Sequence, residues 1–375
     1  MPNFNYIMKI RPNLLSQCKA VDGKIYSLPD YAETLHVQYG NKMFCNKALL
    51  EELGKEIPTT IDEMYEAMVA FKAAHPEGVA YAACTVENSA PWGFLTNAWT
   101  YSTFNTGDAG ELGLRDHNGT VESILDDEEY RAALRFLNKL YTEELLYEGS
   151  FTMDGNQMKA LLASETPVLF WSGMHNVNFV DGAATPELYA NQKPVAPLRG
   201  PDGAQYVTFF PSVPTAGFAI SKTCENVELA IKLADIHYSQ IGFWTVNEGR
   251  EGIEWVWAEE GQVGVSGAPA IANRTGAYIS GLQNVKWEPN ALRAQIDEIC
   301  TSWFDEANYD ETDPADGMFF RPKMTAELYV PYYQDKYQTI PDPKFNSEEE
   351  EELSMISVSL ENYVAESRVD RKSVV

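Results

Sequence analysis

The chain has 375 residues, 45% of them hydrophobic and 22% charged, which is the composition of a folded globular protein. Its formal net charge is -27, from 55 acidic and 28 basic residues. An acidic excess of this size repels phosphate backbones and anionic lipid heads, so it argues against binding to nucleic acid or to a membrane surface. The length allows two or three domain-sized cores.

Sequence motifs of enzymes and metal sites are missing. The chain contains no H-E-x-x-H, no Walker loop of the form G-x-x-x-x-G-K-[ST] and no G-x-S-x-G. Its five cysteines are scattered without a C-x-x-C pair, and its five histidines show no metal-ligand spacing. We therefore expect no cofactor and no metal.

Targeting signals are also missing from the sequence. No run of about 18 apolar residues occurs, so we expect no membrane-spanning helix. Residues 1–15, MPNFNYIMKIRPNLL, lack the apolar core of a secretory signal, which taken alone points to the cytoplasm.

The secondary-structure signals begin with a short strand. Residues 24–28 alternate polar and apolar side chains, as a half-buried strand does. Residues 43–53 have helical spacing and end at Gly54, which takes a left-handed conformation at little steric cost. After a proline break, Thr60 and Glu63 form a T-x-x-E capping box, which predicts the start of a second helix.

The middle of the chain alternates loops, helices and strands. Residues 82–113 are rich in aromatic residues and glycine and show no sustained period. Residues 116–119, Asp-His-Asn-Gly, predict a tight hairpin turn. Helices are expected from about residue 126 to 146 and over 154–163, and an apolar strand over 167–171.

The last third opens with a proline-rich crossing loop over 191–218 and a short strand over 217–220. Asn226 predicts the start of a helix whose apolar face includes Leu229 and Leu233. Further helices are expected over residues 293–304 and from Ser347 onward. Strands that alternate with helices favour an α/β architecture with mostly parallel sheets.

Four blocks of the chain carry a family resemblance. The first runs from DGKIYSLP to MFCNKALLEELGKEIPTTIDEMYEAMVAF over residues 22–71, and the second ends in VLFWSG over 125–173. The third covers 196–239, and the fourth is NEGREGIEW over 247–255. In their order and spacing they resemble the extracellular solute-binding proteins of ABC transporters, family 1, of the large sugar-binding type related to lipoprotein LplA.

The resemblance implies a two-lobed, periplasmic-binding-protein-like (type II) fold with ligand held between two α/β lobes. Carried onto this chain, it assigns residues 1–40 to the first lobe, 41–215 to the second, 216–305 to a return to the first, and 306–375 to a C-terminal helical segment against the second. Family members begin with a lipoprotein signal and a first βαβ portion, and they continue beyond this C-terminus. We therefore expect a chain truncated at both ends, with an incomplete first lobe.

The resemblance also implies a function. We expect a monomeric, non-enzymatic component of an importer that binds a saccharide, in particular an oligosaccharide, and delivers it to the transmembrane subunits of an ABC permease. The full-length protein is expected to be extracellular and anchored to the membrane as a lipoprotein. The hinges between lobes are expected near residues 39–40 and 215–217.

Candidate ligand residues are aromatic or carry amides or carboxylates, because sugars present apolar faces and polar rims. Most have an ordinary alternative role: packing in the core for Trp92 and Trp171, a turn for Tyr31, a local loop cap for Asn176, and a solvated loop position for Glu87 and Asn97. The candidates are Tyr31, Glu87, Trp92, Asn97, Trp171, Asn176 and Glu251.

Two other classes of function stay open from the residues alone. With 55 acidic side chains, a carboxylate pair at glycosidase separation could arise by chance, so a carbohydrate-active hydrolase is the first alternative. A non-catalytic interaction scaffold is the second, and the aromatic-rich loops fit it less well.

Overall fold

The structure is a computed structural model. It describes residues 1–10, 19–30, 35–86, 88–103, 113–210, 215–239, 249–264, 269–270, 272–275 and 317–338, together with the single residues 14, 242, 245, 310, 312, 348, 358 and 362. Within these ranges, no helix has the length and apolar content needed to cross a membrane. The helices expected over 293–304 and from Ser347 lie outside the described residues.

The chain divides into two compact units. Unit 1 comprises Met1–Leu35, Pro211–Asp310 and Lys344–Asn346, and unit 2 comprises His36–Phe210, Glu311–Pro343 and Ser347–Val375. The divisions expected from the sequence fall after residues 40, 215 and 305, whereas the first three observed divisions fall after residues 35, 210 and 310. The assignment of these units to the lobes of a binding protein stays a prediction.

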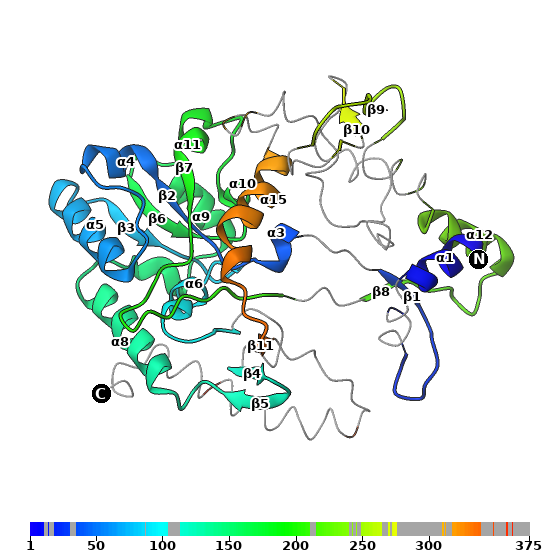
Figure 1. Cartoon of the computed structure of the whole chain (residues 1–375), viewed down its shortest axis with the longest axis horizontal. Helices are drawn as coiled ribbons and strands as arrows, with labels where there is room; N and C mark the ends of the chain where they lie inside the picture. Colours follow the sequence, from blue (N-terminus) through cyan, green and yellow to red (C-terminus); the bar gives the residue numbers. More distant parts are fainter. Residues whose placement is uncertain are drawn as a thin grey trace. The chain divides into compact units, whose positions relative to one another are not determined.

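Unit 2 is built on a four-stranded sheet with the order β3-β6-β2-β7 (Figure 1). The strands are β2 (Met43–Asn46), β3 (Val79–Ala82), β6 (Val168–Ser172) and β7 (Gln192–Val195). β3 and β6 run parallel, whereas β2 is antiparallel to both of its neighbours. Every residue of β3 and β6 is buried, which explains why their sequences are continuous apolar runs.

The remaining elements of unit 2 surround this sheet or extend from it. The α-helices are α4 (Lys47–Glu52), α5 (Ile61–Ala74), α6 (Pro91–Leu95), α8 (Glu128–Thr142), α9 (Gly155–Leu162), α10 (Asn176–Phe179), α11 (Pro186–Asn191) and α15 (Gly317–Leu328). Short 3-10 turns occupy η1 (Thr96–Ala98), η2 (Glu148–Phe151) and η6 (Val330–Tyr332). A second, antiparallel sheet joins β11 (Tyr337–Gln338), β4 (Leu114–His117) and β5 (Thr120–Ser123), and α3 (Leu35–Gln38) begins at the boundary with unit 1.

Local signals placed several of these elements correctly. The Thr60 and Glu63 capping box is present at the start of α5, where the Thr60 side chain accepts a hydrogen bond from the Glu63 N–H at 3.1 Å. The hairpin turn between β4 and β5 is confirmed, and Asn118 and Gly119 both take positive φ there, at 53° and 85°. This is the geometry that an Asn-Gly pair favours.

Two local expectations for unit 2 were wrong. Residues 43–53 are not one helix: β2 occupies Met43–Asn46, and α4 begins only at Lys47, where the Asn46 side chain caps it. The buried M-F-C segment pairs with strands on both sides, and these pairings outweigh its helical spacing. The sheets are also not mostly parallel, since among the described strand pairs only β3 with β6 is parallel.

Unit 1 contains smaller pieces of structure. Its described elements are α1 (Pro2–Ile10), β1 (Leu28–Asp30), β8 (Thr215–Phe218), α12 (Val227–His237), β9 (Trp255–Trp257) and β10 (Ala272–Arg274). β1 pairs antiparallel with β8, and β9 pairs antiparallel with β10. The strand expected over 24–28 is thus shifted toward residues 28–30. Phe4, Ile7, Leu14 and Tyr238 form a small buried core.

Helix α12 is oriented differently from the sequence expectation. Asn226 caps it as predicted, accepting a hydrogen bond from the Leu229 N–H at 3.1 Å. However, the Leu229 and Leu233 side chains are 61% and 39% exposed. Ala234 and His237, which the sequence also assigns to this face, are buried as expected. The buried side further carries Asp235, whose carboxylate accepts a hydrogen bond from the Phe4 N–H at 2.9 Å, near the positive N-terminal end of α1. This polar contact, and not the leucine stripe, faces α1.

Candidate functional site

Three chain segments lie at one edge of the unit 2 sheet, where β3 and β6 end and β2 begins. Trp171 in β6 pairs with Ala82 in the parallel strand β3, so both strands end on the same side. Met43, the first residue of β2, pairs with Ser172, the last residue of β6. Residues 39–42, 83–86 and 173–176 therefore gather at one edge, which we call the sheet edge. In open α/β sheets, ligands bind outside the carboxyl ends of the strands, so the sheet edge is the first place to look for a site.

A polar network centred on Thr208 lies at the sheet edge. The Thr208 hydroxyl accepts hydrogen bonds from the side-chain amides of Asn41 at 3.2 Å and Asn97 at 2.8 Å, and it donates to the Ser102 carbonyl at 2.7 Å. The Asn97 amide also donates to the Gly93 carbonyl at 3.1 Å, and its oxygen accepts from the Ser102 N–H at 3.0 Å. Because these groups are buried and bonded to each other, the Thr208 network holds the segment around residue 208 against the sheet.

Aromatic side chains line the same segment. The Tyr39 ring lies 5.4 Å from Phe209 and 6.4 Å from Tyr333, and Phe209 and Tyr333 lie 5.1 Å apart between ring centroids. The Tyr101 hydroxyl accepts a hydrogen bond from the Phe209 N–H at 3.3 Å. Burial raises the pKa of Tyr39 to about 12, so its hydroxyl stays protonated at neutral pH.

The aromatic contacts continue through Tyr101. Its ring stacks on Tyr337 at 5.4 Å, and Tyr206 makes edge contacts with both rings. We call Tyr39, Tyr101, Tyr206, Phe209, Tyr333 and Tyr337 the aromatic band. Tyr39 and Tyr101 are buried, whereas the other four are partly exposed, so the aromatic band offers both rigid support and accessible ring surface.

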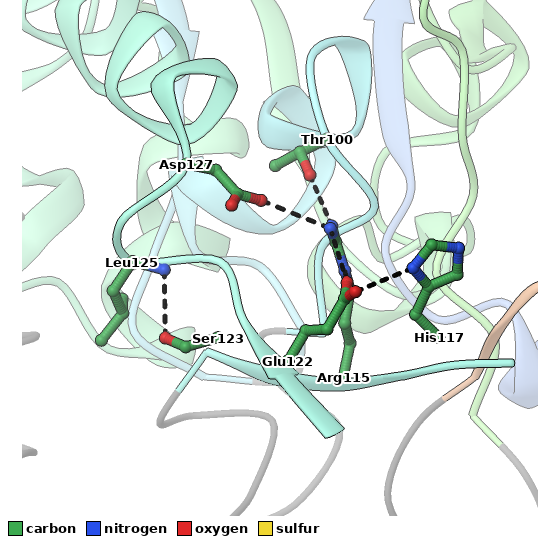
Figure 2. Close-up of polar contacts among 7 residues, drawn as sticks. All are labelled: Thr100, Arg115, His117, Glu122, Ser123, Leu125 and Asp127. Carbon is green, nitrogen blue, oxygen red and sulfur yellow. Dashed lines mark hydrogen bonds and ion pairs between the residues drawn. The ribbon is translucent and has the colours of Figure 1, made fainter. Parts of the chain in front are cut away.

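Arg115 in β4 holds one end of the aromatic band. Its guanidinium lies 4.6 Å from the centre of the Tyr337 ring. Figure 2 shows the same guanidinium donating to the Thr100 hydroxyl at 2.7 Å and lying 3.3 Å from carboxylate oxygens of both Glu122 and Asp127. Burial raises the pKa of Asp127 even though Arg115 opposes that shift. The arrangement fixes the β4–β5 hairpin against the body of unit 2.

Three basic side chains lie together at the sheet edge, and we call His36, Lys42 and His175 the basic cluster. Lys42 is fully buried, and its ammonium donates to the carbonyls of His36, at 2.7 Å, and Tyr39. The His36 and His175 rings are 4.7 Å apart. Burial, followed by the positive charges of Arg321 and Lys42, holds the pKa of His36 well below its usual range. Burial also holds the pKa of His175 well below it.

Two of the sequence-predicted site residues are placed in the interior. Trp171 is completely buried, stacks on Phe44 at 4.6 Å, and donates its ring N–H to the Gln192 side chain. Asn97 is buried with its polar atoms in the Thr208 network. As ligand contacts both stay predictions, but this placement favours packing for Trp171 and a structural role for Asn97.

The other described candidates lie in separate places. Trp92 in α6 is partly exposed and stacks on Phe151 at 6.3 Å. Asn176 is buried at the start of α10, where its side-chain oxygen accepts from the Val177 N–H at 3.0 Å, which favours the local cap. Glu251 belongs to unit 1, is exposed, and accepts a hydrogen bond from the Trp257 ring N–H at 2.7 Å.

Tyr31 and Glu87 lie outside the described residues. The aromatic band was missed by the sequence reasoning altogether. Its signals were the runs QYVTFF over 205–210 and YVPYYQDKY over 329–337, which are dense in aromatic residues. Nothing in either run indicates that tertiary structure brings them together beside Tyr39 and Tyr101.

Comparison with known proteins places the chain in a family. The family model described as bacterial extracellular solute-binding protein matches residues 11–239. The chain is 24% identical over 392 residues to the fructooligosaccharide ABC transporter substrate-binding protein FusA of Streptococcus pneumoniae serotype 4 (strain ATCC BAA-334 / TIGR4), covering 99% of this chain and 67% of that protein.

Solved structures give the same fold. FusA of S. pneumoniae in complex with kestose superposes with a TM-score of 0.68 at 20% identity, covering 99% of this chain and 74% of FusA. An extracellular solute-binding protein from Bifidobacterium longum subsp. infantis gives a TM-score of 0.70 at 20% identity, covering 98% and 75% of the two chains. These likenesses confirm the α/β, periplasmic-binding-protein-like fold class.

The family match also decides between the classes of function left open by the residues. Solute-binding proteins hold their ligand and release it unchanged, so the hydrolase alternative is set aside. Since the match covers more than half of its length, the chain belongs to the bacterial extracellular solute-binding protein family.

Proposed function

We propose that the chain is the substrate-binding component of an ABC importer and that it captures an oligosaccharide for delivery to the permease. Membership of the solute-binding family supports the binding role. The name of the relative FusA, a fructooligosaccharide-binding component, supports a saccharide ligand, as does the structure of FusA with kestose. The extracellular location, the lipoprotein anchor of the full-length protein and the monomeric state belong to the same proposal.

The observation that carries this proposal is the aromatic band beside the sheet edge. Tyr206, Phe209, Tyr333 and Tyr337 keep part of each ring exposed, and buried aromatics and the Arg115 guanidinium hold them in place. A sugar ring stacks its apolar face on such surfaces, while amide and hydroxyl groups orient its hydroxyls. Several rings in a row suit a ligand of more than one sugar unit.

Binding would act on the protein through a change in population. Ligand shifts an open form toward a closed form only by as much as it prefers the closed one. The hinges that we expect near residues 39–40 and 215–217 are part of this proposal. So are ligand contacts from the seven candidates Tyr31, Glu87, Trp92, Asn97, Trp171, Asn176 and Glu251.

The first test is the melting midpoint of the purified chain against neutral and acidic mono- and oligosaccharides. A ligand that binds only the native state raises the midpoint with concentration. We expect a saturable rise with one class of oligosaccharide and recovery of that sugar unchanged. A cooperative melt that no saccharide shifts would overturn the proposal.

The second test asks whether the aromatic band is the binding surface. We expect Tyr333→Ala and Tyr206→Ala each to weaken saccharide affinity about tenfold, which corresponds to about 1.4 kcal/mol of lost stacking. Tyr65→Ala is a matched control, because Tyr65 is a partly exposed tyrosine of α5 whose hydroxyl bonds to Glu143. Equal affinities in all three variants would place the ligand elsewhere.

A further inference from the structure

The basic cluster contains the fully buried Lys42, and burial, followed by the positive charge of Arg321, holds the pKa of its ammonium well below its usual range. Its members come from three segments: His36 from α3, Lys42 from the residue before β2, and His175 from the residue before α10. The partners of the Lys42 ammonium are two carbonyls and the Tyr329 ring, whose centre is 5.4 Å away. Among the residues that the structure describes, no carboxylate forms an ion pair with His36, Lys42 or His175.

The two histidines also leave polar atoms unsatisfied. The Nδ1 atoms of His36 and His175 are both buried, and neither has a hydrogen-bond partner. His175 is only 7% exposed, so its ring is shielded from bulk solvent. A buried polar atom without a partner costs about 1–3 kcal/mol, and natural structures keep few of them without a reason.

The basic cluster lies at the sheet edge, next to the aromatic band. His175 follows β6 and Lys42 precedes β2, so both lie at the sheet edge. Tyr39, a member of the aromatic band, accepts a hydrogen bond from Lys42 through its carbonyl. His36 is partly exposed, so its ring is the part of the basic cluster that an incoming group would meet first. In a chain of net charge -27, the Lys42 ammonium and the nearby Arg321 guanidinium make this region locally positive, which favours an anion.

We propose that the basic cluster receives the acidic group of an acidic saccharide, so that the ligand is an oligosaccharide bearing a carboxylate. This inference rests on the proposed saccharide-binding function and names its substrate class. A carboxylate has the oxygen acceptors that the two imidazoles can donate to, and its charge offsets that of Lys42. The hydroxyls of a neutral oligosaccharide can bond to the Nδ1 atoms, but they bring no charge to offset that of Lys42.

Binding of an acidic saccharide should change the number of protons that the protein holds, and this change can be measured. Burial disfavours a protonated imidazole at both histidines, and so do the charges of Lys42 and of Arg321 in α15. His175 also faces His36, which acts in the same direction. A bound carboxylate reverses that balance and favours protonation of at least one ring. Acidic ligand should therefore bind with net proton uptake at pH 7, whereas a neutral ligand should not.

The experiment compares galactotriose with trigalacturonate as matched neutral and acidic probes, with inorganic sulfate as a third arm. Calorimetric titrations at pH 7 in buffers of different ionisation enthalpy give both affinity and proton uptake. We expect trigalacturonate to bind at least about tenfold more tightly than galactotriose, with proton uptake. Sulfate alone is expected to bind weakly, because it lacks the stacking contacts.

Variants separate the basic cluster from the rest of the site. His175→Phe keeps an aromatic ring beside His36 and removes the imidazole, and His36→Gln is a second variant in case the first fails to fold. Each should reduce the preference for trigalacturonate to less than about threefold and lower the proton uptake below that of the wild type. His75→Phe is the control, since His75 lies at the end of α5 and bonds to Glu52.

The outcomes distinguish this inference from the function on which it rests. Equal or tighter binding of galactotriose, or an acid preference unchanged in His175→Phe and His36→Gln, would overturn the inference and leave saccharide binding intact. Tight sulfate binding without binding of trigalacturonate, or a cooperative melt that responds to none of the three probes, would also overturn the inference. The proposed function is overturned only if no saccharide of the wider panel shifts the melting midpoint.

Discussion

Two groups of buried polar side chains lie at the same edge of the unit 2 sheet and differ in how they are satisfied. In the Thr208 network, the hydroxyl and both asparagine amides bond to one another or to the backbone. In the basic cluster, both histidine Nδ1 atoms lack partners and no described carboxylate balances Lys42. The first arrangement stabilises the fold, whereas the second costs stability and is therefore the better candidate for ligand contact.

The largest effect that would test this comparison comes from Thr208→Val. The change removes three buried hydrogen bonds, those from the Asn41 and Asn97 amides and the one to the Ser102 carbonyl, so we expect a loss of about 2–4 kcal/mol in the free energy of unfolding. Urea denaturation followed by circular dichroism measures it. Saccharide affinity below the melting range should change little, because the network is structural.

Thr142→Val is the control for that variant. Thr142 is exposed at the end of α8, and the same change there should alter unfolding by less than about 0.5 kcal/mol. A loss at Thr208 as small as that at Thr142 would mean that the Thr208 network is not the structural anchor of this edge.

The second effect is a loss of stability on acidification. The folded-state pKa values of His36 and His175 lie below their ordinary value of 6.5, so the unfolded chain takes up protons first as the pH falls. Stability that is present above about pH 6.5 is lost as the pH falls toward the folded-state values, by up to about 1.4 kcal/mol per pH unit for each histidine. Denaturation curves at pH 7, 6 and 5 measure the slope.

His175→Phe sharpens this second test. The variant removes one of the two histidines. The part of the stability slope between pH 7 and 5 that the pair contributes should therefore fall to about half. His75→Phe should leave the whole slope close to that of the wild type. Identical slopes in the wild type and His175→Phe would show that the basic cluster is not the source of the acid sensitivity.

The smallest effect is that of His175→Phe at pH 8, where both histidines are neutral. Replacing a buried polar group that lacks a partner with an apolar ring is close to neutral, so we expect a change between zero and a gain of about 1 kcal/mol. This small change in the free energy of unfolding contrasts with the loss expected for Thr208→Val. A loss above about 2 kcal/mol would show that His175 contributes to the fold through contacts that its orphaned Nδ1 does not reveal.

Local sequence determined the parts of this protein whose chemistry is complete within a few residues. The Thr60 and Glu63 capping box satisfies the first turn of α5 by itself, and Asn118 and Gly119 accept the positive φ of their turn at little cost. The run at 167–171 is apolar because its strand is buried on both faces. The family resemblance follows from the order of such local segments, which is why it could be recognised before the structure was known.

Tertiary structure decided the features that depend on partners distant in the chain. Residues 43–46 are a strand because β6 and β7 pair with them, although their own spacing is helical. Leu229 and Leu233 are exposed because Asp235 faces α1. Trp171 and Asn97 have interior partners that the sequence does not reveal, which favours packing and structural roles for them. The aromatic band and the basic cluster join residues more than 100 positions apart, and no local pattern encodes such contacts because each segment alone leaves its side chains in water.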